Sequence, residues 1–248
     1  MRIAALADIH GNLPALEAVL EEVRREAPDL VVVCGDVASG PMPAETVRLL
    51  RGLTEVRFVS GNADRGLIAA FDHEEGPEWP GPFGEWCSRQ ISREDRDFLS
   101  AFEATVLVDG GDGLGRVLFC HGSPRSDVEA ITAETPAERI RAFTAGLDVD
   151  VVVCGHTHMQ FDRPVGRLRV VNPGSVGMPY GEPGAFWAML GPDVEMRRTA
   201  YDREAAAARI RSLDWPAAEE FARGNVLTVP TAEMAMAFMR EMEAKQDL

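Results

Sequence analysis

Seven side chains that carry oxygen or nitrogen follow short apolar segments of this sequence, at the points where strands would end. They are Asp8, His10, Asp36, Asn62, His121, His156 and His158. The carboxyl ends of strands are where α/β folds place functional groups, so we expect these side chains to converge at one edge. An unpaired buried cluster of this kind would be costly, and bound metal removes that cost. A mixed set of imidazoles and carboxylates suits Mn, Fe, Zn, Ni or Co better than Mg or Ca alone.

The number of ligands indicates two ions. Seven ligands are too many for one first-row ion with open positions, but they suit two ions about 3.5–4 Å apart that share a carboxylate, an arrangement used for hydrolysis at phosphorus. Two divalent ions carry more charge than Asp8, Asp36 and a bridging hydroxide remove. The excess positive charge would attract a phosphate group.

Hydrophobic spacing predicts the elements that hold these residues. Apolar runs indicate strands at 2–7, 30–34 and 55–60, and helical periodicity indicates helices at 12–23 and 43–50. The β-α-β-α-β order predicts a parallel sheet with helices on its faces. Residues 72–84, which include Pro77, Trp79 and Phe83, are predicted to form an ordered loop.

The rest of the chain is predicted to alternate between strands and helices. Helices are expected at 85–90, after Ser92, and at 135–147, 202–213 and 231–244. Strands are expected at 105–108, 116–120 and 149–154, followed by shorter ones at 161–165, 168–171, 186–190 and 194–199 that suit antiparallel pairing.

Composition narrows the class of partner. The 248 residues include 25 Lys and Arg against 40 Asp and Glu, for a net charge of −15. That charge argues against binding of nucleic acid through general electrostatics and against an anionic membrane surface. No apolar run approaches the roughly 18 residues of a membrane helix, and no secretory signal is visible.

The cysteines indicate the cellular compartment. Cys34, Cys87, Cys120 and Cys154 are predicted to be small buried side chains of a protein in a reducing environment, so we expect a cytoplasmic protein.

Five motifs occur in an order typical of a known family. They are Asp8-Ile9-His10-Gly11-Asn12, Gly35-Asp36, Gly61-Asn62-Ala63-Asp64, Cys120-His121-Gly122 and Gly155-His156-Thr157-His158. Over residues 1–190 the chain resembles the calcineurin-like metallophosphoesterase superfamily, and Asn172-Pro173-Gly174-Ser175 resembles its bacterial and archaeal small-phosphodiesterase branch. The resemblance implies an α/β fold, a four-layer α/β/β/α sandwich of two mixed sheets flanked by helices. We expect one domain over 1–248, with a core at about 1–200 and a helical extension at 201–248.

The resemblance also implies roles for the seven residues. Asp8, His10, Asp36 and His158 would hold one ion, and Asp36, Asn62, His121 and His156 the other. Asp36 would bridge the ions, and Asp36, Asn62 and His121 would take part in catalysis. A metal-bound hydroxide would attack phosphorus in line, and manganese is the favoured metal, with Fe, Zn, Ni or Co as alternatives. The expected substrate is a small phosphate ester, in the first place a phosphodiester.

Other functions of the same fold stay open. They are a protein Ser/Thr phosphatase, a dinucleoside polyphosphatase, and a weakly catalytic interaction scaffold. A nuclease is disfavoured by the net charge. The methionines at 234, 236, 239 and 242, with Phe238, are expected to pack in the core, and a face for homo-oligomerisation is the alternative.

Four residues near the motifs have less specific patterns. Arg65 and Arg125 follow ligand motifs and are candidates for phosphate contacts, although surface arginines are the favoured interpretation. Ala63 stands where many relatives have a histidine thought to protonate the leaving group, and we expect Asp64 to orient its neighbours instead. His73 is expected at the surface, with proton donation to the leaving group as the alternative.

Overall fold

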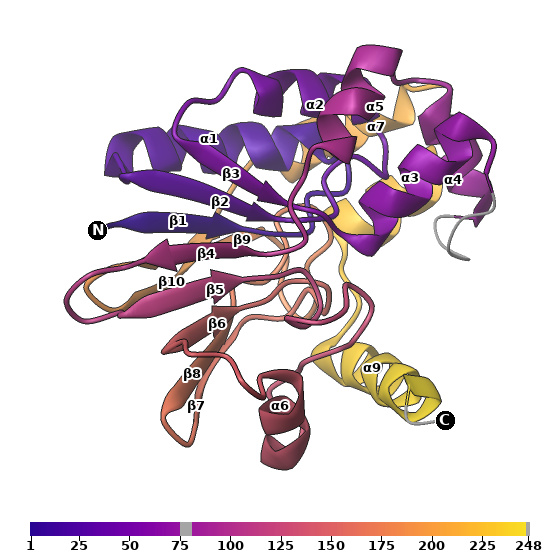
Figure 1. The fold of residues 1–248 in the computed structure, drawn as a ribbon. Helices are drawn as coiled ribbons and strands as arrows, with labels where there is room; N and C mark the ends of the chain where they lie inside the picture. Colours follow the sequence, from indigo (N-terminus) through magenta and orange to yellow (C-terminus); the bar gives the residue numbers. More distant parts are fainter. Residues whose placement is uncertain (75–80, 247–248) are drawn as a thin grey trace.

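The computed structural model describes residues 1–74 and 81–246, and the side chains of residues 81–83 and 244–246 lie outside the description. Two five-stranded mixed sheets stack face to face, and helices cover their outer faces (Figure 1). This arrangement confirms the predicted four-layer α/β/β/α sandwich.

The first sheet has the order β10-β9-β1-β2-β3. Its strands β1 (Ile3–Leu6), β2 (Leu30–Cys34) and β3 (Val56–Val59) run parallel, whereas β9 (Ala185–Leu190) pairs antiparallel with both β1 and β10 (Val194–Thr199). The crossover helices α1 (Leu13–Glu26) and α2 (Pro43–Arg51) lie on its outer face (Figure 1). The β-branched run of β2 is buried along its whole length, as expected for a strand covered on both faces.

The second sheet has the order β4-β5-β6-β8-β7. Its members are β4 (Val106–Asp109), β5 (Arg116–Phe119), β6 (Val151–Val153), β8 (Leu168–Asn172) and β7 (Phe161–Val165). The predicted antiparallel pairing is found between β7 and β8, but β8 also pairs parallel with β6.

Alternating side chains of the strands divide the core into layers. Ile3 and Ala5 of β1 pack against Phe119 and Val153 of the other sheet, whereas Ala4 and Leu6 belong to the layer beneath α1. The two sheets are therefore held together by a dry apolar layer, which fixes the relative positions of the loops at their edges.

Several helices differ from their predicted bounds. The structure has a helix α3 (Asn62–Asp72) that the sequence did not indicate, and α4 covers Gly81–Ser88. The predicted loop at 72–84 is therefore wrong at both ends, and its centre, with Pro77 and Trp79, lies outside the described residues. Ser92 caps α5 (Arg93–Ser100) as expected, while α6 (Ala137–Phe143) is shorter than predicted.

The C-terminal residues form α7 (Arg203–Arg211), α8 (Ala218–Phe221), a π-helix η1 (Ala222–Leu227) and α9 (Ala232–Gln246). Trp215 and Phe221 pack with Leu13 and Met42 beside the first sheet. Helix α9 lies apart from that cluster, beyond the edge toward which the parallel strands point (Figure 1).

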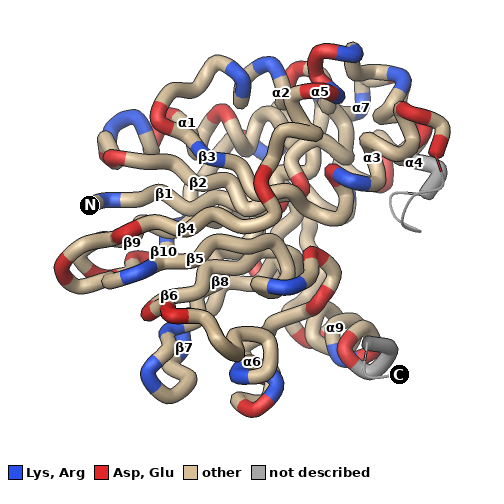
Figure 2. The backbone as a smooth tube through the Cα atoms, viewed as in Figure 1, with Lys and Arg blue, Asp and Glu red and all other residues tan. Residues whose placement is uncertain are grey.

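Charged residues are found mainly on helices and loops, while the central strands carry few (Figure 2). Arginines are interspersed with acidic residues on the outer helices in this view. Within residues 1–74 and 81–246, none of the helices has the length and apolar character that a membrane crossing requires.

Candidate metal centre

The two sheets contribute unequal shares of one cluster of side chains. The loops after β1 and β2 of the first sheet carry Asp8, His10 and Asp36, and Asn62 begins α3 just after β3. The loops after β5 and β6 of the second sheet carry His121, His156 and His158. The structure brings all seven predicted residues together at the carboxyl ends of the strands.

The cluster divides into two groups. In the first, the ligand atoms of Asp8, His10 and His158 lie within 4.8 Å of one another, and in the second those of Asp36, His121 and His156 do so. The amide oxygen of Asn62 lies 3.0 Å from Nε2 of His121, which adds it to the second group. The same partition is implied by the family resemblance.

One carboxylate oxygen lies between the two groups. The Oδ2 atom of Asp36 is 3.3 Å from Nε2 of His121 and 3.7 Å from Nε2 of His10. The other oxygen, Oδ1, accepts a hydrogen bond of 2.8 Å from the backbone N–H of Ala63. That bond fixes the carboxylate so that Oδ2 faces both groups.

Strained backbone aims five of the seven side chains. Eight non-glycine residues in the described part of the chain have positive φ, and five of them belong to the cluster: Asp8, His10, Asp36, His156 and His158. L-residues rarely adopt this conformation, and such strain concentrates at functional sites. Each turn directs a side chain from the end of a strand into the space between the sheets.

Backbone carbonyls fix the tautomers of three histidines. The Nδ1 atoms of His121 and His158 lie 2.7 Å from the carbonyl of Cys34 and 2.8 Å from that of Met178. Nδ1 of His10 lies 3.3 Å from the carbonyl of Ser39. Because each Nδ1–H donates to a carbonyl, the Nε2 atom of each ring faces the cluster, which is the arrangement found around metal-ligating histidines.

Ionisation in the cluster follows from burial and close charges. Although burial favours its neutral form, the Asp36 carboxylate raises the pKa of His121 to about 10. Burial opposes ionisation of Asp36, yet the charge of His121 holds the pKa of Asp36 well below its ordinary value. Burial, followed by the charge of His121, lowers the pKa of His156 to about 4. Without a metal, His121 therefore carries a proton beside the Asp36 carboxylate at neutral pH, and a bound cation would take the place of that proton.

The donor set fits divalent transition metals. Nε2 of His156 is buried and has no hydrogen-bond partner among the described residues, so its lone pair is free to bind an ion. Opposed lone pairs on His10 and His158, and on His121 and Asn62, repel one another unless a cation or a proton lies between them. Imidazole, carboxylate and amide ligands suit Mn, Fe, Zn, Ni and Co.

Asp64 holds the backbone around Asp36 in place through hydrogen bonds. It is fully buried and accepts hydrogen bonds of 2.8 Å from the N–H of Asp36, 2.9 Å from that of Val37 and 3.0 Å from that of Gly61. Burial, followed by the charge of Asp36, raises the pKa of Asp64 to about 7. These contacts agree with the expectation that Asp64 positions its neighbours.

The two candidate arginines are engaged elsewhere. Arg65 forms a bidentate pair with Asp127, with Nη2 2.8 Å from Oδ1, and Nε of Arg125 lies 2.9 Å from Glu129. Both line a separate cavity of about 320 Å³ that reaches His121. His73 is exposed at the C-terminal cap of α3, as expected, and it does not line the cavity at the cluster.

A cavity of about 250 Å³ opens onto the cluster. Five of the predicted residues line it, and so do Met178 and Tyr180, which the sequence analysis did not single out, and three residues of α9. The ring of Tyr180 stacks on His158, with centroids 5.3 Å apart. The sequence analysis assigned the residues of α9 to the core or to a homo-oligomer face and not to this site, because nothing local relates α9 to a site built from the strands.

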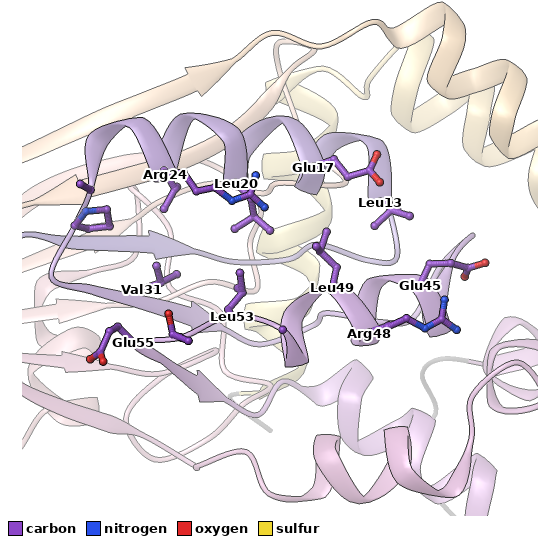
Figure 3. Close-up of a pocket in the computed structure, with 15 residues that line it drawn as sticks. Leu13, Glu17, Leu20, Arg24, Val31, Glu45, Arg48, Leu49, Leu53 and Glu55 are labelled. Carbon is purple, nitrogen blue, oxygen red and sulfur yellow. The ribbon is translucent and has the colours of Figure 1, made fainter.

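A second hollow, of about 840 Å³, lies between α1 and α2 above Val31 (Figure 3). Leu20, Leu49 and Leu53 line it, and charged side chains such as Arg24 and Glu45 stand along it. It has no histidine or cysteine among its lining residues, so the metal chemistry of this fold belongs to the cavity at the strand ends.

Comparison with known proteins agrees with this architecture. Residues 1–192 match the Calcineurin-like phosphoesterase superfamily domain, and the chain belongs to this superfamily of metal-dependent phosphoric ester hydrolases. The chain is 28% identical to the uncharacterized protein MJ0912 of Methanocaldococcus jannaschii, over 71% of this chain and 76% of that protein. It is 27% identical to the phosphodiesterase YfcE of Escherichia coli K12, over 78% of this chain and 89% of YfcE.

A solved structure extends the likeness to the C-terminal region. The metallophosphoesterase from Sphaerobacter thermophilus aligns with a TM-score of 0.73 and 26% identity, covering 92% of this chain and 98% of that one.

Proposed function

We propose that this protein is a dinuclear metal-dependent phosphodiesterase. The observation that carries the proposal is the position of Asp36, whose Oδ2 lies between the groups of His10 and His121. The names of relatives such as YfcE favour a diester as substrate. Asp8, His10, Asp36 and His158 would hold one ion, and Asp36, Asn62, His121 and His156 the other.

When bound, two divalent cations supply an activated water for in-line attack on phosphorus and neutralise charge that develops on the phosphoryl oxygens. The residues of this chain orient that chemistry. The carbonyls of Cys34, Ser39 and Met178 hold three imidazoles in one tautomer. Asp64 and the N–H of Ala63 hold Asp36 in place. We favour manganese as the native metal and a small phosphate ester as the substrate.

The test combines metal analysis with a substrate panel. Chelated protein should be inactive, and Mn²⁺ should restore hydrolysis of bis(4-nitrophenyl) phosphate with a higher kcat/KM than for 4-nitrophenyl phosphate. A preference for the monoester would favour a phosphatase. Two bound ions without turnover of either compound would favour an interaction scaffold.

A further inference from the structure

The cavity at the metal centre is lined by two kinds of side chain. The polar ones are His10, Asp36, Asn62, His156 and His158. The largely apolar ones are Met178, Tyr180, Phe238, Met239 and Met242. Three of these apolar residues belong to α9, which lies outside the residues 1–192 that match the superfamily domain.

Helical spacing gives α9 one apolar face toward this cavity. Ala235, Phe238, Met239 and Met242 are separated by three, one and three residues, so they share a face. Met239 is only 2% exposed, whereas Phe238 is 54% exposed although it lines the cavity. Met239 therefore packs inside as predicted, whereas the predicted core position of Phe238 is wrong, because Phe238 lies at the mouth.

Polar contacts hold α9 in this position. The hydroxyl of Thr135 donates to Oε1 of Glu243 over 2.6 Å, and Arg240 pairs with Glu134 at 2.7 Å. The N–H of Gly181 donates to the carbonyl of Pro230 over 2.9 Å, just before the helix begins. These contacts tie both ends of α9 to the body of the protein.

We propose that the apolar face of α9 binds the organic ester group of the substrate, a compact aryl or alkyl substituent, while the phosphoryl group lies at the metal centre. This inference rests on the proposed function. The aromatic ring of Phe238 and the methionine thioethers form a surface that suits an aryl or alkyl group. They provide no charged group or strong hydrogen-bond donor for a phosphate. The volume of about 250 Å³ lies below the range of about 300–1,000 Å³ usual for drug-sized ligands, so the ester group is small.

The test measures binding of compounds that cannot be hydrolysed. Phenylphosphonate and methylphosphonate share a phosphoryl group and have P–C bonds, so they report contacts of the substituent without turnover. Calorimetry on the Mn²⁺-loaded protein should show phenylphosphonate binding about tenfold more tightly than methylphosphonate, because the ring loses apolar surface to α9. Inorganic phosphate serves as the reference without a substituent.

Two variants of α9 and one control decide the matter. Phe238→Ala and Met242→Ala should each reduce the ratio of the two Kd values toward one, with the Kd of inorganic phosphate unchanged. Met234→Ala is the matched control, since Met234 is 63% exposed and does not line the cavity. Equal Kd values for the two phosphonates in the wild type, or a ratio that neither variant alters, would overturn the assignment.

The binding test of α9 and the activity test of the proposed function can fail independently of each other. Selective binding of phenylphosphonate with no hydrolysis of any diester would support the role of α9 and contradict the activity. Diester hydrolysis with no selectivity would do the reverse.

Discussion

The Nε2 atoms of His10 and His158 lie 3.2 Å apart, although the two residues lie in loops that follow strands of different sheets and are 148 positions apart in the chain. Each ring donates its Nδ1–H to a backbone carbonyl, so the two Nε2 atoms face each other. A proton or a metal cation between them turns the repulsion of two lone pairs into attraction, and Asp8 and Asp36 lie close enough to balance its charge. The packing of the two sheets against each other brings these two nitrogen atoms together.

Replacement of the bridging carboxylate should affect both ions. Asp36→Asn removes the charge whose Oδ2 faces His10 and His121, so we expect activity to fall at least about 100-fold and metal content to fall at both positions. Metal analysis and kcat with bis(4-nitrophenyl) phosphate measure this. Asp162→Asn, in a surface pair with Arg169, is the control. A variant with two ions and wild-type turnover would refute the bridging role.

The close approach of Gly61 to Asp36 should make that glycine essential. A Cβ added at Gly61 would lie 2.1 Å from Oδ1 of Asp36, so Gly61→Ala must displace the carboxylate. We expect weaker metal binding and a loss of activity of about 10- to 100-fold, as for other supporting residues of metal sites. At Gly52 the nearest atom would be 3.4 Å away, so Gly52→Ala should keep full metal content. Wild-type metal affinity in both variants would show that Asp36 tolerates displacement.

Because position 63 is an alanine and not a histidine, the reaction rate should depend on the pKa of the leaving group. A positioned general acid typically contributes about 10²–10⁴-fold, and its absence hurts most when the departing alkoxide is strongly basic. We expect kcat to depend steeply on leaving-group pKa across a series of methyl aryl phosphates. Ala63→His should raise activity on poor leaving groups more than on nitrophenyl esters.

His73 provides the control for this prediction. Since it is exposed and does not line the cavity, His73→Ala should leave the dependence unchanged. A shallow dependence that becomes steep in His73→Ala would instead identify His73 as the proton donor.

The N-terminus of α5 should make stability depend on pH. Burial raises the pKa of Asp95, but hydrogen bonds from Ser92 and Arg51 outweigh it and hold the pKa below its ordinary value. The stabilisation is therefore present above the ordinary pKa of an aspartate and is lost as the pH falls through the folded-state value. Asp95→Ala should lower the free energy of unfolding by about 1 kcal/mol at pH 7.

Urea titrations at several pH values measure this difference. The gap between wild type and Asp95→Ala should close below about pH 4. The control Asp97→Ala, on the same helix, should change the free energy of unfolding little at any of these pH values. If the difference between wild type and Asp95→Ala persists in acid, the charge of Asp95 is not its source.

The strands and the metal cluster were predictable because their signals are local. Short β-branched runs such as Leu30–Cys34 are typical of strands covered on both faces, and a polar residue follows within three positions of the end of each. The parallel order then places Asp8, Asp36 and Asn62 at one edge without any knowledge of packing.

What escaped prediction depends on contacts between distant segments. Helix α3 begins inside the Gly61-Asn62 motif and contains Gly66, so its helical pattern is weak. The place of α9 is set by Thr135 and Glu134, more than 100 residues away, and no periodicity within α9 reveals that partner. For the same reason, the engagement of Arg65 with Asp127 could not be read from the motif.

The left-handed turns at Asp8, His10, Asp36, His156 and His158 also bear on how this protein can evolve. Glycine adopts that backbone without strain, whereas aspartate and histidine adopt it at a cost that the surrounding structure must offset. In a descendant with no use for metal, glycine at these positions would relieve that strain. The five turns therefore give up some stability so that their side chains point at one another.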